Sequence, residues 1–272
     1  MVLNFAGYIR RLSVERRLYS ILSRETKIDA LDHLVKAMQH TNSSSLSDRT
    51  AIGFDANVFL TLASHQKGPE VIDFLAAKHS GSLILPGQVI QEFWNNQLNA
   101  VDTLYAAVKK KLDPLKVEVA KIDKADIEYL SEIEALLDQF GANYQSLYGA
   151  ETRRAVTEWL NVLRTKARVS FVSRRRFAPI AAERDLTKTP PGFKDGGNGD
   201  FYVWADFLLG LGLARADGNT FSQCVLVTGD RKIDWVRDGV AHPILAAEVS
   251  AFLGVPFEVW TTRQLVEAVA RA

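Results

Sequence analysis

Short apolar runs alternate with amphipathic segments along most of this 272-residue chain. Runs of only a few apolar residues, bounded by polar or turn-forming residues, predict buried strands at 51–55, 82–86, 223–228 and 256–261. Apolar residues at helical spacing predict helices at 56–63, 71–77, 88–98, 152–163, 200–214, 243–253 and 263–270. Because strands and helices follow one another in turn, the pattern favours strand–helix–strand units and a parallel sheet.

Three parts of the chain depart from this pattern. Residues 1–48 are predicted to form an N-terminal helical extension, with one or two helices and a polar tether, ahead of a main domain at 49–272. Apolar stripes between about 100 and 140 predict two amphipathic helices inserted as a hairpin. The segment 170–199 is polar and rich in Arg, Pro and Gly, so we expect a loop there.

Composition then narrows the class of protein. Lys and Arg number 33 against 32 Asp and Glu, and 47% of the residues are hydrophobic, which excludes a disordered chain and predicts an ample core. The single cysteine, Cys224, excludes an intrachain disulfide and a cysteine-based zinc cluster. Neither a membrane-spanning apolar run nor a signal-like N-terminal segment is evident, so we expect a cytoplasmic protein with no membrane partner.

Four acidic residues stand at comparable positions. Asp55 and Asp230 each follow an apolar run, Asp200 opens a helix, and Glu92 lies one turn into the helix after the second run. Since the carboxyl ends of parallel strands meet at one edge of a sheet, we expect these carboxylates to converge. Crowded carboxylates repel one another unless a cation compensates, and hard oxygen ligands favour Mg²⁺ or Mn²⁺. A metal ion held in this way suits phosphodiester hydrolysis.

Each acid taken alone also has a purely structural interpretation. Asp200 is a preferred N-cap residue, Asp55 suits a turn, and Glu92 suits a solvated helix face. Spacing alone therefore leaves both interpretations open.

The order of the motifs resembles that of PIN domains. The segments FDANVFL at 54–60 and LILPGQVIQEF at 83–93 are similar to the opening of such a domain, and VLVTGDRKIDW at 225–235 is similar to its closing strand and acidic loop. Between them, PPGFKD followed by GDFYVW, within 190–204, resembles a bacterial PIN-like subfamily with a PPGxKD…GDxxxW signature. The likeness covers about residues 51–270.

This resemblance implies a three-layer α/β/α sandwich with a central parallel sheet and a divalent-metal nuclease centre. The acids implied to act in catalysis and to bind Mg²⁺ or Mn²⁺ are Asp55, Glu92, Asp200 and Asp230. Asp195 is implied as an additional metal-binding acid, and Asp234 as a weaker one. Asn57 and Thr228 match polar positions that support the metal ligands.

Basic residues near the PPGFKD segment are candidates for contacts with nucleic acid, because guanidinium groups bind phosphate through two parallel hydrogen bonds. These candidates are Arg174, Arg175, Arg176 and Lys194. For the arginine run, a solvated basic turn is an equally open interpretation.

Taken together, these features predict a Mg²⁺- or Mn²⁺-dependent endonuclease and favour RNA over DNA as its substrate. The resemblance fits a toxin or defence effector with an antitoxin or sensor protein as partner, and a homodimer is a further expectation. Three alternatives stay open: a DNA nuclease, a metal-dependent phosphohydrolase of small molecules, and a non-catalytic module that binds nucleic acid or protein.

Overall fold

The computed structural model describes residues 5–39, 45–95, 151–194 and 196–272, and between them residues 110, 114–115 and 117–118. At the centre of this part of the chain lies a five-stranded parallel sheet in the order β3-β2-β1-β4-β7. Its strands are β1 (Thr50–Phe54), β2 (Leu83–Pro86), β3 (Ala167–Ser170), β4 (Gln223–Val227) and β7 (Phe257–Trp260). A separate antiparallel pair is formed by β5 (Val236–Arg237) and β6 (Val240–Ala241).

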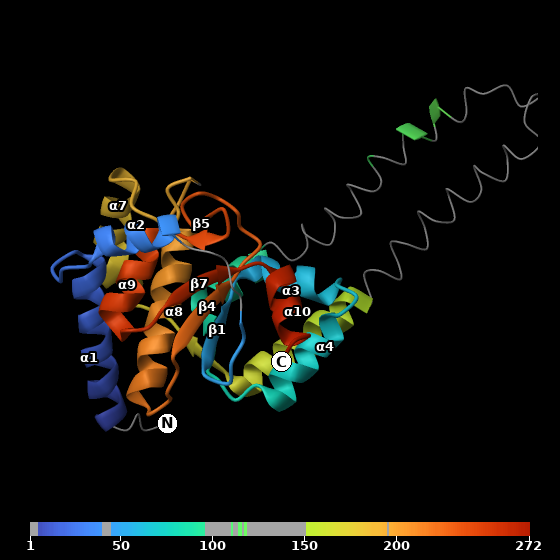
Figure 1. Cartoon of the computed structure of the whole chain (residues 1–272), viewed down its shortest axis with the longest axis horizontal. Helices are drawn as coiled ribbons and strands as arrows, with labels where there is room; N and C mark the ends of the chain where they lie inside the picture. The colour runs from blue at the N-terminus through green and yellow to red at the C-terminus, as the bar shows by residue number, and fades with distance from the viewer. Residues whose placement is uncertain are drawn as a thin grey trace, which may run out of the picture.

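Helices cover both faces of the sheet (Figure 1). On one side lie α1 (Phe5–Leu22), α2 (Ala30–Gln39), α7 (Arg174–Leu186), α8 (Gly199–Ala216) and α9 (Pro243–Leu253). On the other lie α3 (Ala56–Ala63), α4 (Gly68–Asp73), the π-helical turn η1 (Phe74–Lys78) and α10 (Thr262–Val269). Helices at 87–95 and 151–166 join this second side, where Phe93 and Trp159 pack against Phe59 of α3. The expected three-layer α/β/α sandwich is therefore confirmed.

The four strands predicted from apolar runs are present as β1, β2, β4 and β7. Every residue of β1 and β2 is buried, and so are four of the five residues of β4. A parallel sheet with helices on both faces has no solvated side, which is why its strands have continuous apolar sequences. The predicted helices around them are present too, as far as the described residues extend.

The expectation of a loop over 170–199 is wrong, because β3 ends at its start and α7 fills its middle. β3 lies at the edge of the sheet with Val169 44% exposed, so it lacks a continuous apolar run. The buried face of α7 includes a charged residue, Arg184, and Pro179 lies inside the helix. Both features obscure the helical pattern in the sequence.

Outside the sheet, the structure describes most of the N-terminal extension but little of the expected hairpin. In the N-terminal extension both α1 and α2 are present, and Leu18, Ile21 and Leu22 of α1 belong to the same hydrophobic core as the strands. The division of the chain at residue 48 stays a prediction. Residues 40–44 and most of the hairpin expected at about 100–140 lie outside the described residues. None of the helices described is long and apolar enough to cross a membrane.

Two glycines allow α8 to lie very close to the sheet. A Cβ on Gly53 of β1 would be 2.4 Å from the ring of Phe207, and a Cβ on Gly210 of α8 would be 2.5 Å from Ile84 of β2. Any larger residue at either position would force the helix and the sheet apart. This close packing fixes α8 over β2 and β3, with Phe207 reaching across to β1, and its N-terminus lies at the end of the sheet where the parallel strands finish (Figure 1).

Gly53→Ala should destabilise the protein by about 1–3 kcal/mol, because the ring of Phe207 is fully buried and packs against Trp204 and Phe257. Urea unfolding followed by circular dichroism measures this change.

Gly7→Ala is the matched control, since Gly7 is exposed in α1 with nothing within 4 Å of an added Cβ. There alanine should raise stability by up to about 1 kcal/mol or leave it unchanged. Equal stability of Gly53→Ala and the wild type would show that α8 does not depend on this contact.

Candidate active site

Asp55 lies where β1 ends and α3 begins, and it is the N-cap of α3. Its carboxylate accepts hydrogen bonds from the Ala56 backbone N–H at 2.6 Å, from the Asn57 amide at 2.9 Å and from the Thr228 hydroxyl at 2.6 Å. Burial raises the pKa of Asp55, while these three donors oppose the rise. Because Thr228 follows β4, its hydroxyl joins the ends of the neighbouring strands β1 and β4.

Asp230 lies two residues beyond Thr228 and is held against it, since its backbone N–H donates to the Thr228 hydroxyl at 3.0 Å. One carboxylate oxygen of Asp230 accepts from the Lys232 backbone N–H at 2.9 Å, and the other pairs with the Lys232 ammonium at 2.8 Å. Burial and the charges of Asp234 and Asp55 raise its pKa. Asn57 completes the link between the strand ends, because its carbonyl oxygen accepts from Gly229 N–H at 2.6 Å.

Asp200 lies in the first turn of α8. Its pKa is raised to about 7, first by burial and then by the negative charges of Asp55, Asp230 and Glu92. The Trp235 indole N–H donates to Asp200 Oδ2 at 3.3 Å and opposes the rise. A carboxyl group that titrates near neutral pH is common where like charges crowd an active site.

Glu92 points toward the start of α8 from the helix at 87–95. A Cβ on Gly199, the residue before Asp200, would be 2.7 Å from Glu92 Oε1. The Gln88 amide donates to that same oxygen at 3.0 Å. Glu92 is half-buried, and burial followed by the negative charge of Asp55 raises its pKa. Glu92, Asp200 and Asp230 thus all lie within electrostatic range of Asp55. That the four carboxylates form one site stays a prediction.

The donor chemistry of this cluster fits a hard divalent cation, since carboxylate oxygens are the ligands that Mg²⁺ and Mn²⁺ prefer. As placed, however, no three acidic, histidine or cysteine side chains among the described residues are close enough together to hold a metal ion. Asp195, the fifth acid implied by the resemblance, lies outside those residues.

The segment 190–194 packs against Asp200. Gly192 has a φ of 98°, a conformation that favours glycine, and a Cβ there would be 3.1 Å from the Asp200 Cβ. The backbone N–H groups of Gly192 and Lys194 donate to Asp234 Oδ2 at 3.0 and 3.4 Å. Asp234 is fully buried, so it supports this segment instead of offering an open ligand.

A buried charge cluster that the sequence did not predict contacts the segment 190–194 as well. Glu248 of α9 is fully buried and pairs with Arg184 at 2.7 Å and with Arg24 at 2.6 Å, while the Trp204 indole donates to it at 2.6 Å. Arg184 also donates to the Pro190 carbonyl. The signal available in the sequence is a lone acid in the otherwise apolar stretch at 243–253.

The basic candidates for nucleic-acid contact do not share one surface. Arg175 and Lys194 are exposed, as such a contact requires. Arg176 lies over the Tyr19 ring at 5.0 Å, and Arg174 lies over the Tyr202 ring at 4.3 Å while it pairs with buried Asp206 at 2.9 Å. Two of the four side chains therefore face the protein, and contact with nucleic acid stays a prediction.

An α/β/α sandwich with acids gathered where its parallel strands end defines a class of enzyme-like folds, in which ligands bind at that edge. Within this class, the chain belongs to the PIN-like domain family, whose model matches residues 51–245. Members of this family are generally nucleases. No curated protein and no solved structure matches the chain. α1, α2, β7 and α10 lie outside the matched segment.

The raised pKa of Asp200 predicts how the metal-free protein responds to pH. The folded protein keeps this proton up to about pH 7, whereas the unfolded chain loses it near 3.8, so stability falls as pH rises between these values. In the presence of a chelator, Asp200→Asn should stabilise the protein at pH 8 by about 2–4 kcal/mol, and by much less at pH 4.5.

Chemical denaturation at the two pH values measures this difference. Asp73→Asn, at an exposed position in α4, is the control and should change stability by no more than about 0.5 kcal/mol at either pH. A gain from Asp200→Asn that does not depend on pH would contradict the crowding of charge around Asp200.

Proposed function

We propose that this protein is a divalent-metal-dependent endonuclease that hydrolyses phosphodiester bonds, in RNA more readily than in DNA. The observation that supports this most is that the negative charge of Asp55, at the end of β1, raises the pKa values of Glu92, Asp200 and Asp230. Such a cluster is costly without a cation, and its oxygens suit Mg²⁺ or Mn²⁺. Membership of a family of nucleases favours phosphodiesters over small-molecule phosphates as substrates.

In this proposal Asp55, Glu92, Asp200 and Asp230 hold the metal ion. When bound, the ion would polarise a phosphate oxygen and make an attacking hydroxide available near neutral pH. Thr228 and Asn57 keep Asp55 oriented through their hydrogen bonds at 2.6 and 2.9 Å. Lys232, paired with Asp230 at 2.8 Å, offsets part of the negative charge that an approaching phosphate would meet.

The biological setting follows from the family resemblance alone. We propose a cytoplasmic toxin or defence effector that cleaves RNA, held in check by an antitoxin or released by a sensor protein. The genes beside the coding sequence test this directly: a small neighbouring gene supports an antitoxin, and a sensor ATPase gene supports a defence system.

Asp230→Asn should lower the cleavage rate by at least about 100-fold, because losing a metal ligand costs more than losing one of its hydrogen-bond partners. Asp55→Asn should do the same while keeping the N-cap of α3, since Asn caps helices as well as Asp does. Single-turnover cleavage of labelled RNA under limiting Mg²⁺ measures both variants. Asp73→Asn serves again as the control, and a wild-type rate for Asp230→Asn would refute the proposal.

Cleavage of mixed RNA should exceed cleavage of single- and double-stranded DNA, and EDTA should abolish it. Parallel reactions at equal nucleotide concentration measure this preference. Faster cleavage of DNA would make the protein a DNA nuclease. If the protein binds RNA with no turnover, and Asp55→Asn binds it equally well, the PIN-like fold serves here as a binding module.

A further inference from the structure

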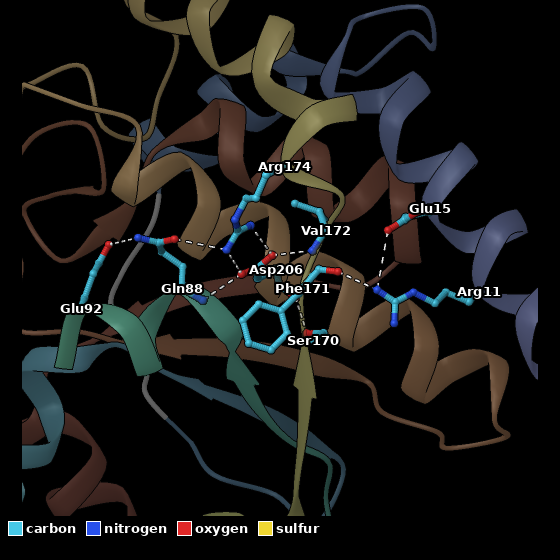
Figure 2. Close-up of polar contacts among 9 residues, drawn as sticks. All are labelled: Arg11, Glu15, Gln88, Glu92, Ser170, Phe171, Val172, Arg174 and Asp206. Atoms are coloured by element: carbon cyan, nitrogen blue, oxygen red, sulfur yellow. Dashed lines mark hydrogen bonds and ion pairs between the residues drawn. The ribbon is translucent and has the colours of Figure 1, made fainter. Parts of the chain in front are cut away.

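We propose that three side chains form a relay that orients Glu92 toward the metal-binding cluster: Gln88, Arg174 and Asp206. The relay runs from inside the helical layer to the edge of the site, and Figure 2 shows the contacts in sequence. The inference deepens the proposed function and rests on it, because Glu92 matters as a ligand only if the cluster binds a metal ion.

Asp206 is the fixed end of the relay. It is fully buried in α8, in a stretch of otherwise apolar residues. Its carboxylate accepts from the backbone N–H groups of Val172 at 2.7 Å and Gln88 at 2.9 Å, so it joins the start of α7 to the helix at 87–95. The Ser170 hydroxyl donates to the Asp206 carbonyl at 2.6 Å. A buried carboxylate with this many partners has no freedom to shift.

Arg174 is the middle member. Its Nη1 and Nη2 donate to the two carboxylate oxygens of Asp206, each at 2.9 Å, which is the bidentate geometry of a strong arginine–carboxylate pair. Nη2 also donates to Gln88 Oε1 at 3.2 Å. With its face 4.3 Å from the centre of the Tyr202 ring, the guanidinium is held on several sides. It is therefore poorly placed to bind phosphate.

Gln88 links Arg174 to Glu92 through hydrogen bonds at both ends of its side-chain amide. Because Arg174 occupies the carbonyl oxygen of the Gln88 side chain, the amide NH₂ points the other way and donates to Glu92 Oε1 at 3.0 Å. Gln88 and Glu92 are four residues apart on one helix, which places them on the same face. The hydrogen bond directs Glu92 Oε1, while Oε2 has no hydrogen bond to any of the residues that the structure describes.

The N-terminal extension braces the same region. Arg11 of α1 donates to the Phe171 carbonyl at 2.7 Å, between the Ser170 and Val172 contacts of Asp206 (Figure 2). A helix outside the family match thus supports the link on which Arg174 depends.

Gln88→Met tests the relay without disturbing its anchor, because the Gln88 backbone N–H still donates to Asp206. Hydrogen-bond partners of metal ligands are typically worth about 10–100-fold in affinity, so Mn²⁺ binding measured by calorimetry should weaken about 10-fold. The turnover number should fall, while KM for RNA and its salt dependence stay unchanged. Gln91→Met, an exposed change on the same helix, is the matched control and should bind Mn²⁺ as the wild type does.

Arg174→Lys separates the relay from a direct contact with nucleic acid. Lysine keeps the positive charge beside Asp206 but lacks the fork that reaches both Asp206 and Gln88, so Mn²⁺ affinity should again fall about 10-fold. If KM rises and the salt dependence flattens while Mn²⁺ affinity is unchanged, Arg174 binds phosphate and the relay is wrong.

The two proposals fail in different ways. A wild-type protein that binds no Mn²⁺ and cleaves nothing removes the proposed function and the relay with it. A wild-type protein that binds Mn²⁺ and cleaves RNA, beside a Gln88→Met variant that matches it in both, overturns the relay alone.

Discussion

The close approach of α8 to the sheet is the constraint on which the candidate site depends. Glycines at positions 53 and 210 let the helix lie where any Cβ would collide with Phe207 or Ile84. Asp55 ends β1 and Asp200 opens α8, so the spacing between strand and helix sets how near these carboxylates come. Packing in the apolar core thus determines the electrostatics at the edge of the sheet.

Buried charges then decide how the helices around α8 are arranged. Asp206 and Glu248 are fully buried, and each is neutralised by arginine with close hydrogen bonds. Removing such ions from water is costly, so pairs of this kind contribute more to a specific arrangement than to stability. In this protein they connect the core to the site: one pair leads through Gln88 to Glu92, and the other holds the Pro190 carbonyl in the segment beside Asp200.

The cluster itself opposes folding. Burial raises the pKa values of all four acids, and the negative charge of Asp55 adds to the rise at Glu92, Asp200 and Asp230. Carboxyl groups with raised pKa values are common at functional sites, where they perform chemistry that an ordinary core does not need. The rest of the fold offsets this loss of stability, because the sheet is covered on both faces and the hydrophobic core is continuous.

The sequence by itself determined the parallel sheet and the α/β/α class, because strands buried on both faces have continuous apolar runs. It also placed Asp55 directly after the first of these runs. It did not reveal β3 or α7, since an edge strand and a helix with a buried arginine lack that pattern. Only the tertiary structure decided that Asp206 and Glu248 are anchors and that Arg174 faces inward. These roles depend on contacts between residues far apart in the chain, such as Arg174 with Asp206, 32 positions apart, and Gln88 with Asp206, 118 positions apart, which local sequence does not encode.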